Sequence, residues 1–139
     1  MTRPKNRLQL MERLDAVQLN NVWSWCAVNE AEKKAYFSIW TDNAHAHNGE
    51  KGYLIQRPTG DEDGEEATRS AARNDRNAKF ALVFEQGYDA YGYFIVAKDR
   101  FAQPREIAET RTSFVMKLRL ERLDDGSIWA VAIDRLEIQ

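Results

Sequence analysis

The sequence predicts an α+β fold, in which a strongly bent mixed or antiparallel sheet, or a small β-barrel, carries flanking helices. Two segments rich in aromatic and β-branched residues, 22–28 and 35–41, have the composition of a β-hairpin. Strict alternation of apolar and polar residues over 114–121, followed by a turn at 124–126, predicts a second hairpin. About seven strand-like and two helix-like segments fit one domain over residues 1–139, and bending or closure would remove exposed sheet edges.

The bulk composition is that of a globular protein able to bury a core. The chain has 139 residues, of which 43% are hydrophobic and 30% charged, with a net charge of -2. This overall charge gives no indication of non-specific nucleic-acid binding and leaves a local basic patch open. A single cysteine excludes an internal disulfide and predicts a reducing, cytoplasmic location. No apolar run reaches the roughly 18–20 residues that span a bilayer, and the charged N-terminus does not resemble a signal peptide, so we expect no membrane partner.

The first half of the chain is dominated by rings. Residues 6–18 are predicted to form a helix because their apolar residues recur at helical spacing. The hairpin that follows contains three of the four tryptophans, and strand geometry places large rings on both of its faces. One core face does not need so many rings, so we expect the second face to have a further use. A loop is predicted at 41–52 and a short strand at 53–56.

The second half alternates one polar helix with several strands. The helix is predicted at about 65–77, where the only apolar residues are alanines. Residues 79–85 have the pattern of a buried strand, although so short an apolar run leaves a continuation of the helix open. The apolar run 91–97 predicts a strand buried on both faces, in which Gly92 indicates a bulge or a close approach. Residues 99–111 are predicted to be irregular.

No pattern in the sequence is typical of a catalytic or metal site. There is no phosphate-binding loop, no dinucleotide-binding glycine motif and no serine-hydrolase motif. His45 and His47 are the only histidines, and such a pair falls short of the three or four ligands that zinc needs. We therefore expect no catalytic residue, no metal and no cofactor, and a binding protein is favoured over an enzyme.

Arginines of the predicted polar helix form a stripe. Arg69, Arg73 and Arg76 stand at positions i, i+4 and i+7, and Arg57 precedes the helix. The stripe is either a solvated face that complements the helix dipole or a row of contacts to nucleic-acid phosphates. The sequence leaves both interpretations open.

Aromatic and polar residues around the first hairpin are candidates for a ligand pocket, since tryptophan and tyrosine rings stack well on a flat nucleobase. Short polar side chains at the strand ends could hydrogen-bond the edge of such a base, and two tyrosines beyond the hairpin could add a wall. The candidate ligand-binding residues are Trp25, Trp40, Asp42, Ser24, Asn43, Tyr88 and Tyr91. The alternative is that these rings belong to the core.

Four segments resemble the PUA-like domains, namely 24–27, 37–42, 91–99 and 125–130. These domains occur fused to HNH nucleases in modification-dependent restriction enzymes and are similar in architecture to the SRA, EVE and YTH domains. The resemblance extends over the chain from about residue 22. It implies a small bent-sheet barrel that holds a modified base in an aromatic pocket, with Trp25, Trp40 and Asp42 at that pocket.

The sequence thus predicts a non-catalytic domain that binds DNA or RNA carrying a modified base. Two alternatives stay open. One is a protein-interaction or inhibitor module of phage or plasmid type, with no nucleic-acid role, whose acidic segment 61–66 meets a protein partner. The other is a small hydrolase with an unrecognised carboxylate site.

Overall fold

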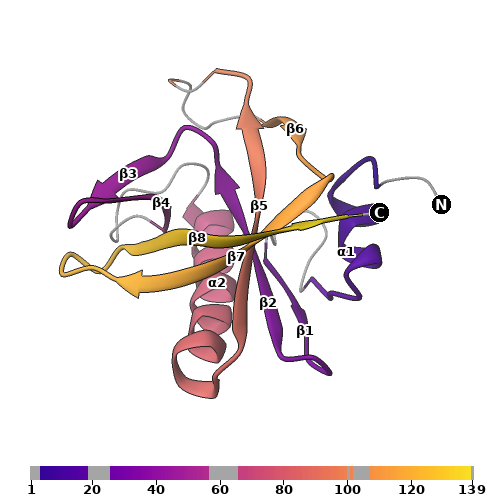
Figure 1. Cartoon of the computed structure of the whole chain (residues 1–139), viewed down its shortest axis with the longest axis horizontal. Coiled ribbons are helices and arrows are strands. Elements are labelled where there is room, and N and C mark those ends of the chain that lie inside the picture. Colours follow the sequence, from indigo (N-terminus) through magenta and orange to yellow (C-terminus); the bar gives the residue numbers. More distant parts are fainter. Residues whose placement is uncertain (1–3, 19–25, 57–65, 100, 102–106, 139) are drawn as a thin grey trace.

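The computed structural model describes residues 4–18, 26–56, 66–99, 101 and 107–138, and for residues 66–72 it describes the backbone alone. Two helices and eight strands follow one another along the chain (Figure 1). They are α1 (Arg7–Arg13), β1 (Cys26–Asn29), β2 (Lys34–Trp40), β3 (Ala44–His47), β4 (Glu50–Gln56), α2 (Glu66–Gln86), β5 (Asp89–Ala97), β6 (Ile107–Thr110), β7 (Phe114–Arg122) and β8 (Ile128–Glu137).

The strands form one mixed sheet, which confirms the α+β class. Their order is β1-β2-β5-β7-β8-β4-β3, with β6 paired to β5 beside this path. The β2–β5 pair is parallel, and the other paired strands are antiparallel. Among the described residues no ladder joins β1 to β3, so the sheet is open and the expected closure into a small barrel is not confirmed. The edges are limited instead by short strands and by a bridge between Val17 and Val28.

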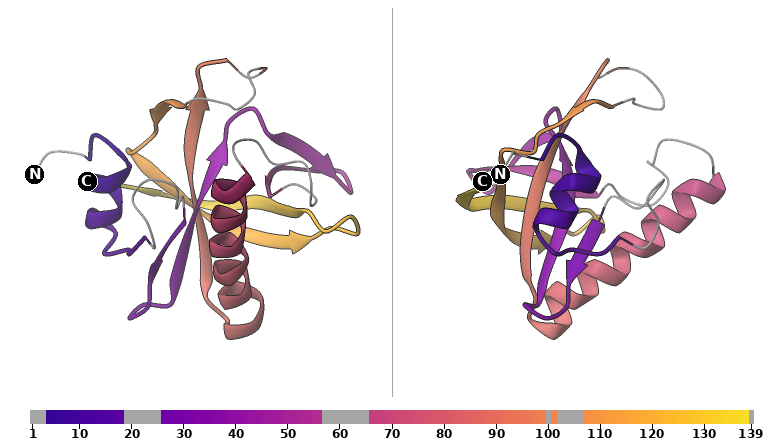
Figure 2. Two further views of the ribbon diagram at one scale, coloured as in Figure 1. Left: turned by 180° about the vertical axis from the view of Figure 1, so that it is seen from behind. Right: turned by 90° about the vertical axis from the view of Figure 1, so that its right-hand side faces the viewer.

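Each face of the sheet has its own core. On one face, which α2 crosses (Figure 2), Phe80 of α2 stacks on Phe37 of β2 with ring centroids 4.8 Å apart. On the other face Leu10 of α1 packs among tyrosines, of which Tyr36 and Tyr91 stack at 5.3 Å. Of the described rings of the first hairpin, Phe37 belongs to the first core and Tyr36 to the second, while Trp40 packs against the second core from its edge. Trp23 and Trp25 lie outside the described residues, so the predicted further use of the second face stays a prediction.

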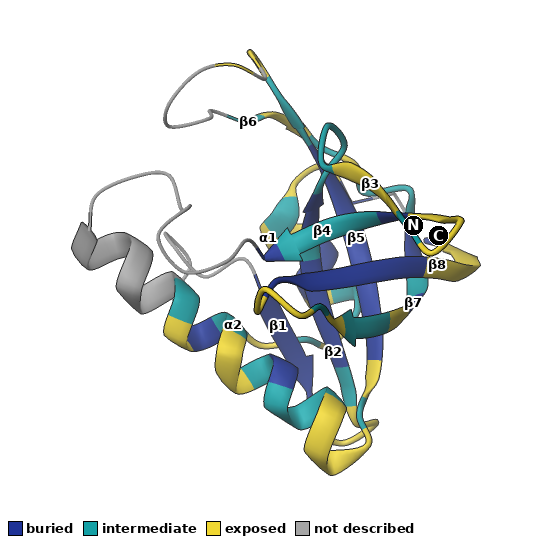
Figure 3. Ribbon diagram, turned by 90° about the vertical axis from the view of Figure 1, so that its left-hand side faces the viewer, coloured by how far each residue is buried: buried dark blue, intermediate teal, exposed yellow. Residues whose placement is uncertain are grey.

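Helix α2 is longer than the sequence predicts. It runs from Glu66 to Gln86, so residues 79–85, predicted as a buried strand, are its last turns. Burial along this segment is one-sided, since Phe80 is 1% exposed while Phe84 is 36% exposed (Figure 3). Gly87 follows the last helical residue, and its φ of 75° suits a residue without a side chain.

The segment predicted as a loop at 41–52 contains a hairpin. Strands β3 and β4 pair antiparallel, with His47 opposite Glu50. The two residues between them, Asn48 and Gly49, have φ values of 51° and 81°. Positive φ at both positions is the mark of a type I′ turn, the tight hairpin turn that Asn-Gly favours.

The C-terminal hairpin and the strand at 91–97 agree with the prediction. Strands β7 and β8 pair from Phe114 opposite Glu137 to Arg122 opposite Ile128, with one irregularity. In β5, a side chain added at Gly92 would lie 2.5 Å from the terminal carbon of Ile39, which confirms the expected close approach.

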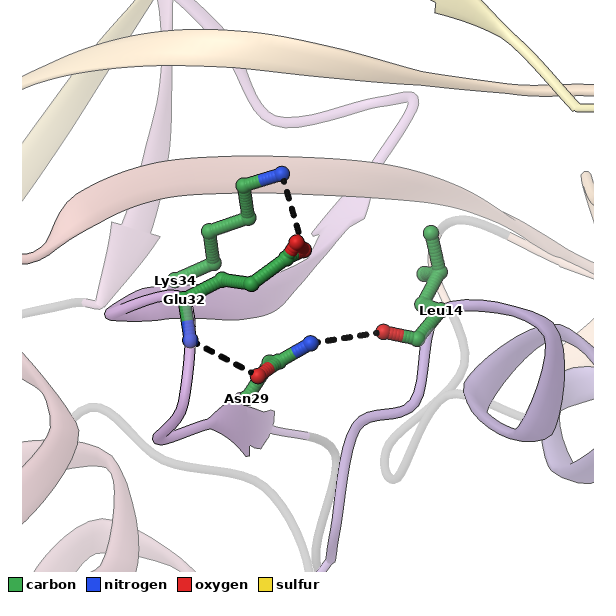
Figure 4. Close-up of polar contacts among 4 residues, drawn as sticks. All are labelled: Leu14, Asn29, Glu32 and Lys34. Atoms are coloured by element: carbon green, nitrogen blue, oxygen red, sulfur yellow. Dashed lines mark hydrogen bonds and ion pairs between the residues drawn. The ribbon is translucent and has the colours of Figure 1, made fainter.

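Helix α1 is shorter than predicted, and its end is tied to the first hairpin. It begins after Asn6, whose side chain accepts a hydrogen bond from the Gln9 N–H, and it ends at Arg13. The Asn29 amide then donates to the Leu14 carbonyl at 3.3 Å and accepts from the Glu32 N–H at 3.0 Å (Figure 4). In the described part of the chain, neither helix is long and apolar enough to cross a membrane.

Candidate ligand site at the end of strand β2

The parallel pairing of β2 with β5 fixes the position of Trp40. Trp40 is the last residue of β2 and lies opposite Ile95. The next residue, Thr41, donates its N–H to the Ile95 carbonyl at 3.1 Å. The Trp40 ring is half-buried and packs against the same core as Tyr36, at the point where that core reaches the end of the strand.

Asn43 holds the turn that follows. Its N–H donates to the Trp40 carbonyl at 3.1 Å, and its carbonyl accepts from the Leu54 N–H at 3.0 Å. Its side-chain amide donates to the Leu54 carbonyl at 3.2 Å. Asp42, which is half-buried, is therefore carried on the turn between β2 and β3, which is fixed by bonds to Trp40 and to Leu54 of β4.

Of the candidate pocket residues, the structure brings together Trp40, Asp42 and Asn43. Tyr91 lies elsewhere, 6% exposed and stacked on Tyr36, and Tyr88 packs against the core on the opposite face. These two tyrosines therefore do not form one wall. Ser24 and Trp25 lie outside the described residues.

Two residues that the sequence did not single out belong to the same end of the sheet. Strand β5 continues past Ile95 to Ala97, so the chain after it leaves the sheet beside the end of β2 (Figure 1). Lys98 is exposed there, and Phe101 is 79% exposed. Strands in parallel register end at the same edge, but the sequence did not show that β2 and β5 pair in parallel.

One residue of the arginine stripe, Arg76, anchors α2 to the sheet. Arg76 is partly buried and donates from Nε to the Gln56 Oε1 at 3.0 Å, and the Gln56 amide donates to Asn77 Oδ1 at 2.8 Å. Burial lowers the pKa of Arg76. Arg73 is half-buried on the same helix. Arg57 and the side chain of Arg69 lie outside the described residues.

Three groups that could act as acids or nucleophiles, Cys26, Tyr36 and Tyr93, are buried in the cores. Burial, with the Asp75 carboxylate as a smaller cause, raises the pKa of the Cys26 thiol to about 12, which keeps it protonated at neutral pH. Burial likewise raises the pKa of Tyr36 to about 12 and raises that of Tyr93. Within the described residues, no three His, Cys, Asp or Glu side chains are grouped to hold a metal ion.

Surface cations tend to lie beside carboxylates. Arg119 is 2.6 Å from Glu50, and Arg135 is 2.8 Å from Glu137. These parts of the described surface therefore intersperse both charge signs.

Comparison with known proteins gives no relative from which a function of the site could be inferred. No protein-family model, curated protein or solved structure matches this chain.

Proposed function

We propose that this chain is a non-catalytic binding domain that recognises nucleic acid and holds a modified base at the end of β2. The observation that supports this proposal is the grouping of Trp40, Asp42 and Asn43 on one fixed turn, with the Trp40 ring half-buried. A half-buried ring and a carboxylate two residues further along the same turn would offer a base one stacking surface and one hydrogen-bond acceptor.

Each residue has a distinct role in the proposal. The Trp40 ring stacks on the base, a contact worth about 1–3 kcal/mol per base. The Asp42 carboxylate accepts a hydrogen bond from an N–H group on the base edge, which selects bases that carry such a group. Asn43 is a positioning residue, since its backbone and amide bonds to Trp40 and Leu54 hold the turn.

The charge distribution supports base recognition as the main source of affinity. Because described cations such as Arg119 and Arg135 are paired with carboxylates, few phosphate contacts are expected. Each phosphate contact adds about 0.7–0.9 to the slope of log affinity against log salt, so this slope should be shallow.

The test is a binding screen by fluorescence anisotropy with short DNA and RNA strands, each present in an unmodified form and with single modified bases. The proposal predicts that at least one modified strand binds about tenfold or more tightly than its unmodified partner, which corresponds to about 1.4 kcal/mol. Equal binding of all strands, or none, would contradict it and favour the protein-interaction module. Cleavage of a strand would favour the hydrolase.

A further inference from the structure

The face of α2 that meets the sheet changes character along the helix. At Phe80 the contact is apolar, through the stack on Phe37. One turn earlier it is charged: the Asp75 side chain is 1% exposed and forms an ion pair with Lys79, whose side chain is 14% exposed. Beneath them the thiol of Cys26 on β1 is hydrogen-bonded to Asp75.

A second polar contact joins the same part of α2 to β4. Gln56 is 5% exposed and bonds both Arg76 and Asn77. Between Asp75 and Lys79 the described contacts of α2 with the sheet are thus polar and involve two strands, through Cys26 on β1 and Gln56 on β4. The apolar contacts of the helix are made in its last turns, by Phe80, Leu82 and Val83.

The sheet keeps many contacts that do not involve α2. On the α2 face, Phe94 packs edge-on against Tyr53 at 5.2 Å and against Phe114 at 6.1 Å, all from strands. On the opposite face the core around Tyr36 and Leu10 includes no residue of α2. Loss of the helix would therefore remove only part of one core.

Polar and apolar contacts respond differently when two elements separate. Burying an ion pair costs the hydration free energy of both charges, and much of that free energy is regained when both charges return to water together. Apolar surface gains nothing on exposure. The polar middle of α2 is therefore a weak attachment compared with the two-sided core of the sheet.

We propose that α2 is a releasable strap, which detaches from the sheet as a unit while the sheet and the core beneath α1 stay folded. The release uncovers Cys26 and the face of the sheet around Phe37. It converts a buried thiol into an accessible one, so a reagent that alkylates thiols reports on it directly.

The test is native-state labelling of Cys26, the only cysteine, with iodoacetamide at a series of urea concentrations below the unfolding transition. Mass spectrometry gives the labelling rate, and equilibrium unfolding gives the rate that global unfolding alone would allow. The proposal predicts labelling at least about tenfold faster than that limit, with a clearly weaker dependence on urea, as expected for a local opening. Labelling with the rate and urea dependence of global unfolding would overturn it, as would labelling as fast as that of a free thiol.

Variants test the role of the ion pair. Lys79→Met leaves the Asp75 carboxylate buried without its cation and should speed labelling by about tenfold or more. The double variant Asp75→Leu with Lys79→Met replaces both charges and should label no faster than the wild type. Lys51→Met, at an exposed lysine of β4, is the matched control and should leave the rate unchanged. Equal rates in Lys79→Met and Lys51→Met would overturn the role given to the pair.

Discussion

Trp129 and Trp40 occupy two different kinds of place in the same sheet. Trp129 lies on β8, between β7 and β4, is 1% exposed, and donates its indole N–H to the His45 carbonyl at 2.9 Å. Trp40 ends β2 and is half-buried. The difference shows that position along and across the sheet decides how far a ring is buried. Residue type alone does not decide it.

The largest expected effect separates these two tryptophans by stability. Trp129→Ala removes a fully buried ring and should lower the free energy of unfolding by about 3–5 kcal/mol. Trp40→Ala removes a ring that is already partly solvated and should cost less than half as much. Urea denaturation of both variants measures the difference, and equal losses would place Trp40 in the core.

A smaller effect tests how tightly Trp129 is enclosed. A side chain carbon at Gly52 would lie 2.5 Å from the Ala130 carbonyl oxygen and 2.7 Å from the Trp129 indole. Gly52→Ala should therefore destabilise the protein by about 1–3 kcal/mol through overpacking. The neighbouring exposed Lys51→Ala should change stability by no more than about 0.5 kcal/mol. A neutral Gly52→Ala would show that the region around Trp129 can yield.

The contrast between buried and exposed side chains also applies to the arginines. Arg76→Ala leaves the buried Gln56 oxygen without its donor and should cost about 1–3 kcal/mol in thermal or urea unfolding. Arg111→Ala, at an exposed arginine 3.9 Å from Glu109, is the control and should cost no more than about 0.5 kcal/mol. If both cost the same, Arg76 does not anchor the helix.

The smallest effect concerns binding. If Arg73 contacts a phosphate, Arg73→Ala should weaken the binding of every strand alike. It should also lower the slope of log affinity against log salt concentration by about 1. The measurement is the affinity of the best strand of the screen for the wild type and for Arg73→Ala at several salt concentrations. An unchanged slope would remove the helix from the interface and leave the turn after β2 as the contact.

Local patterns carried much of the fold. The alternation at 114–121 and the turn at 124–126 were enough to predict β7 and β8, because side-chain alternation and turn chemistry act between neighbouring residues. Two further local signals are present in the sequence. Asn48-Gly49 is typical of the tight turn between β3 and β4. Gly87 is typical of a helix end, and no glycine or proline interrupts the chain between residues 66 and 86, which favours one long helix over a helix followed by a strand.

The sequence predicts the contacts around the candidate site that are local in the chain, but not those between distant segments. Residues Trp40, Asp42 and Asn43 are near one another in the chain, so their grouping was predictable. The stack of Tyr36 on Tyr91 follows from the parallel pairing of β2 and β5, which are about 50 residues apart and need a crossover. The anchoring of Arg76 by Gln56 likewise depends on how α2 lies against β4.

The most direct test of the account is the binding of the best strand from the screen to Trp40→Ala, with its thermal melting measured in parallel and Trp129→Ala melted for comparison. If Trp40 stacks on the base, Trp40→Ala stays folded and loses about 1–3 kcal/mol of binding free energy, roughly a 5- to 150-fold rise in Kd. A folded Trp40→Ala that binds as tightly as the wild type would contradict it, and so would a Trp40→Ala that melts as early as Trp129→Ala.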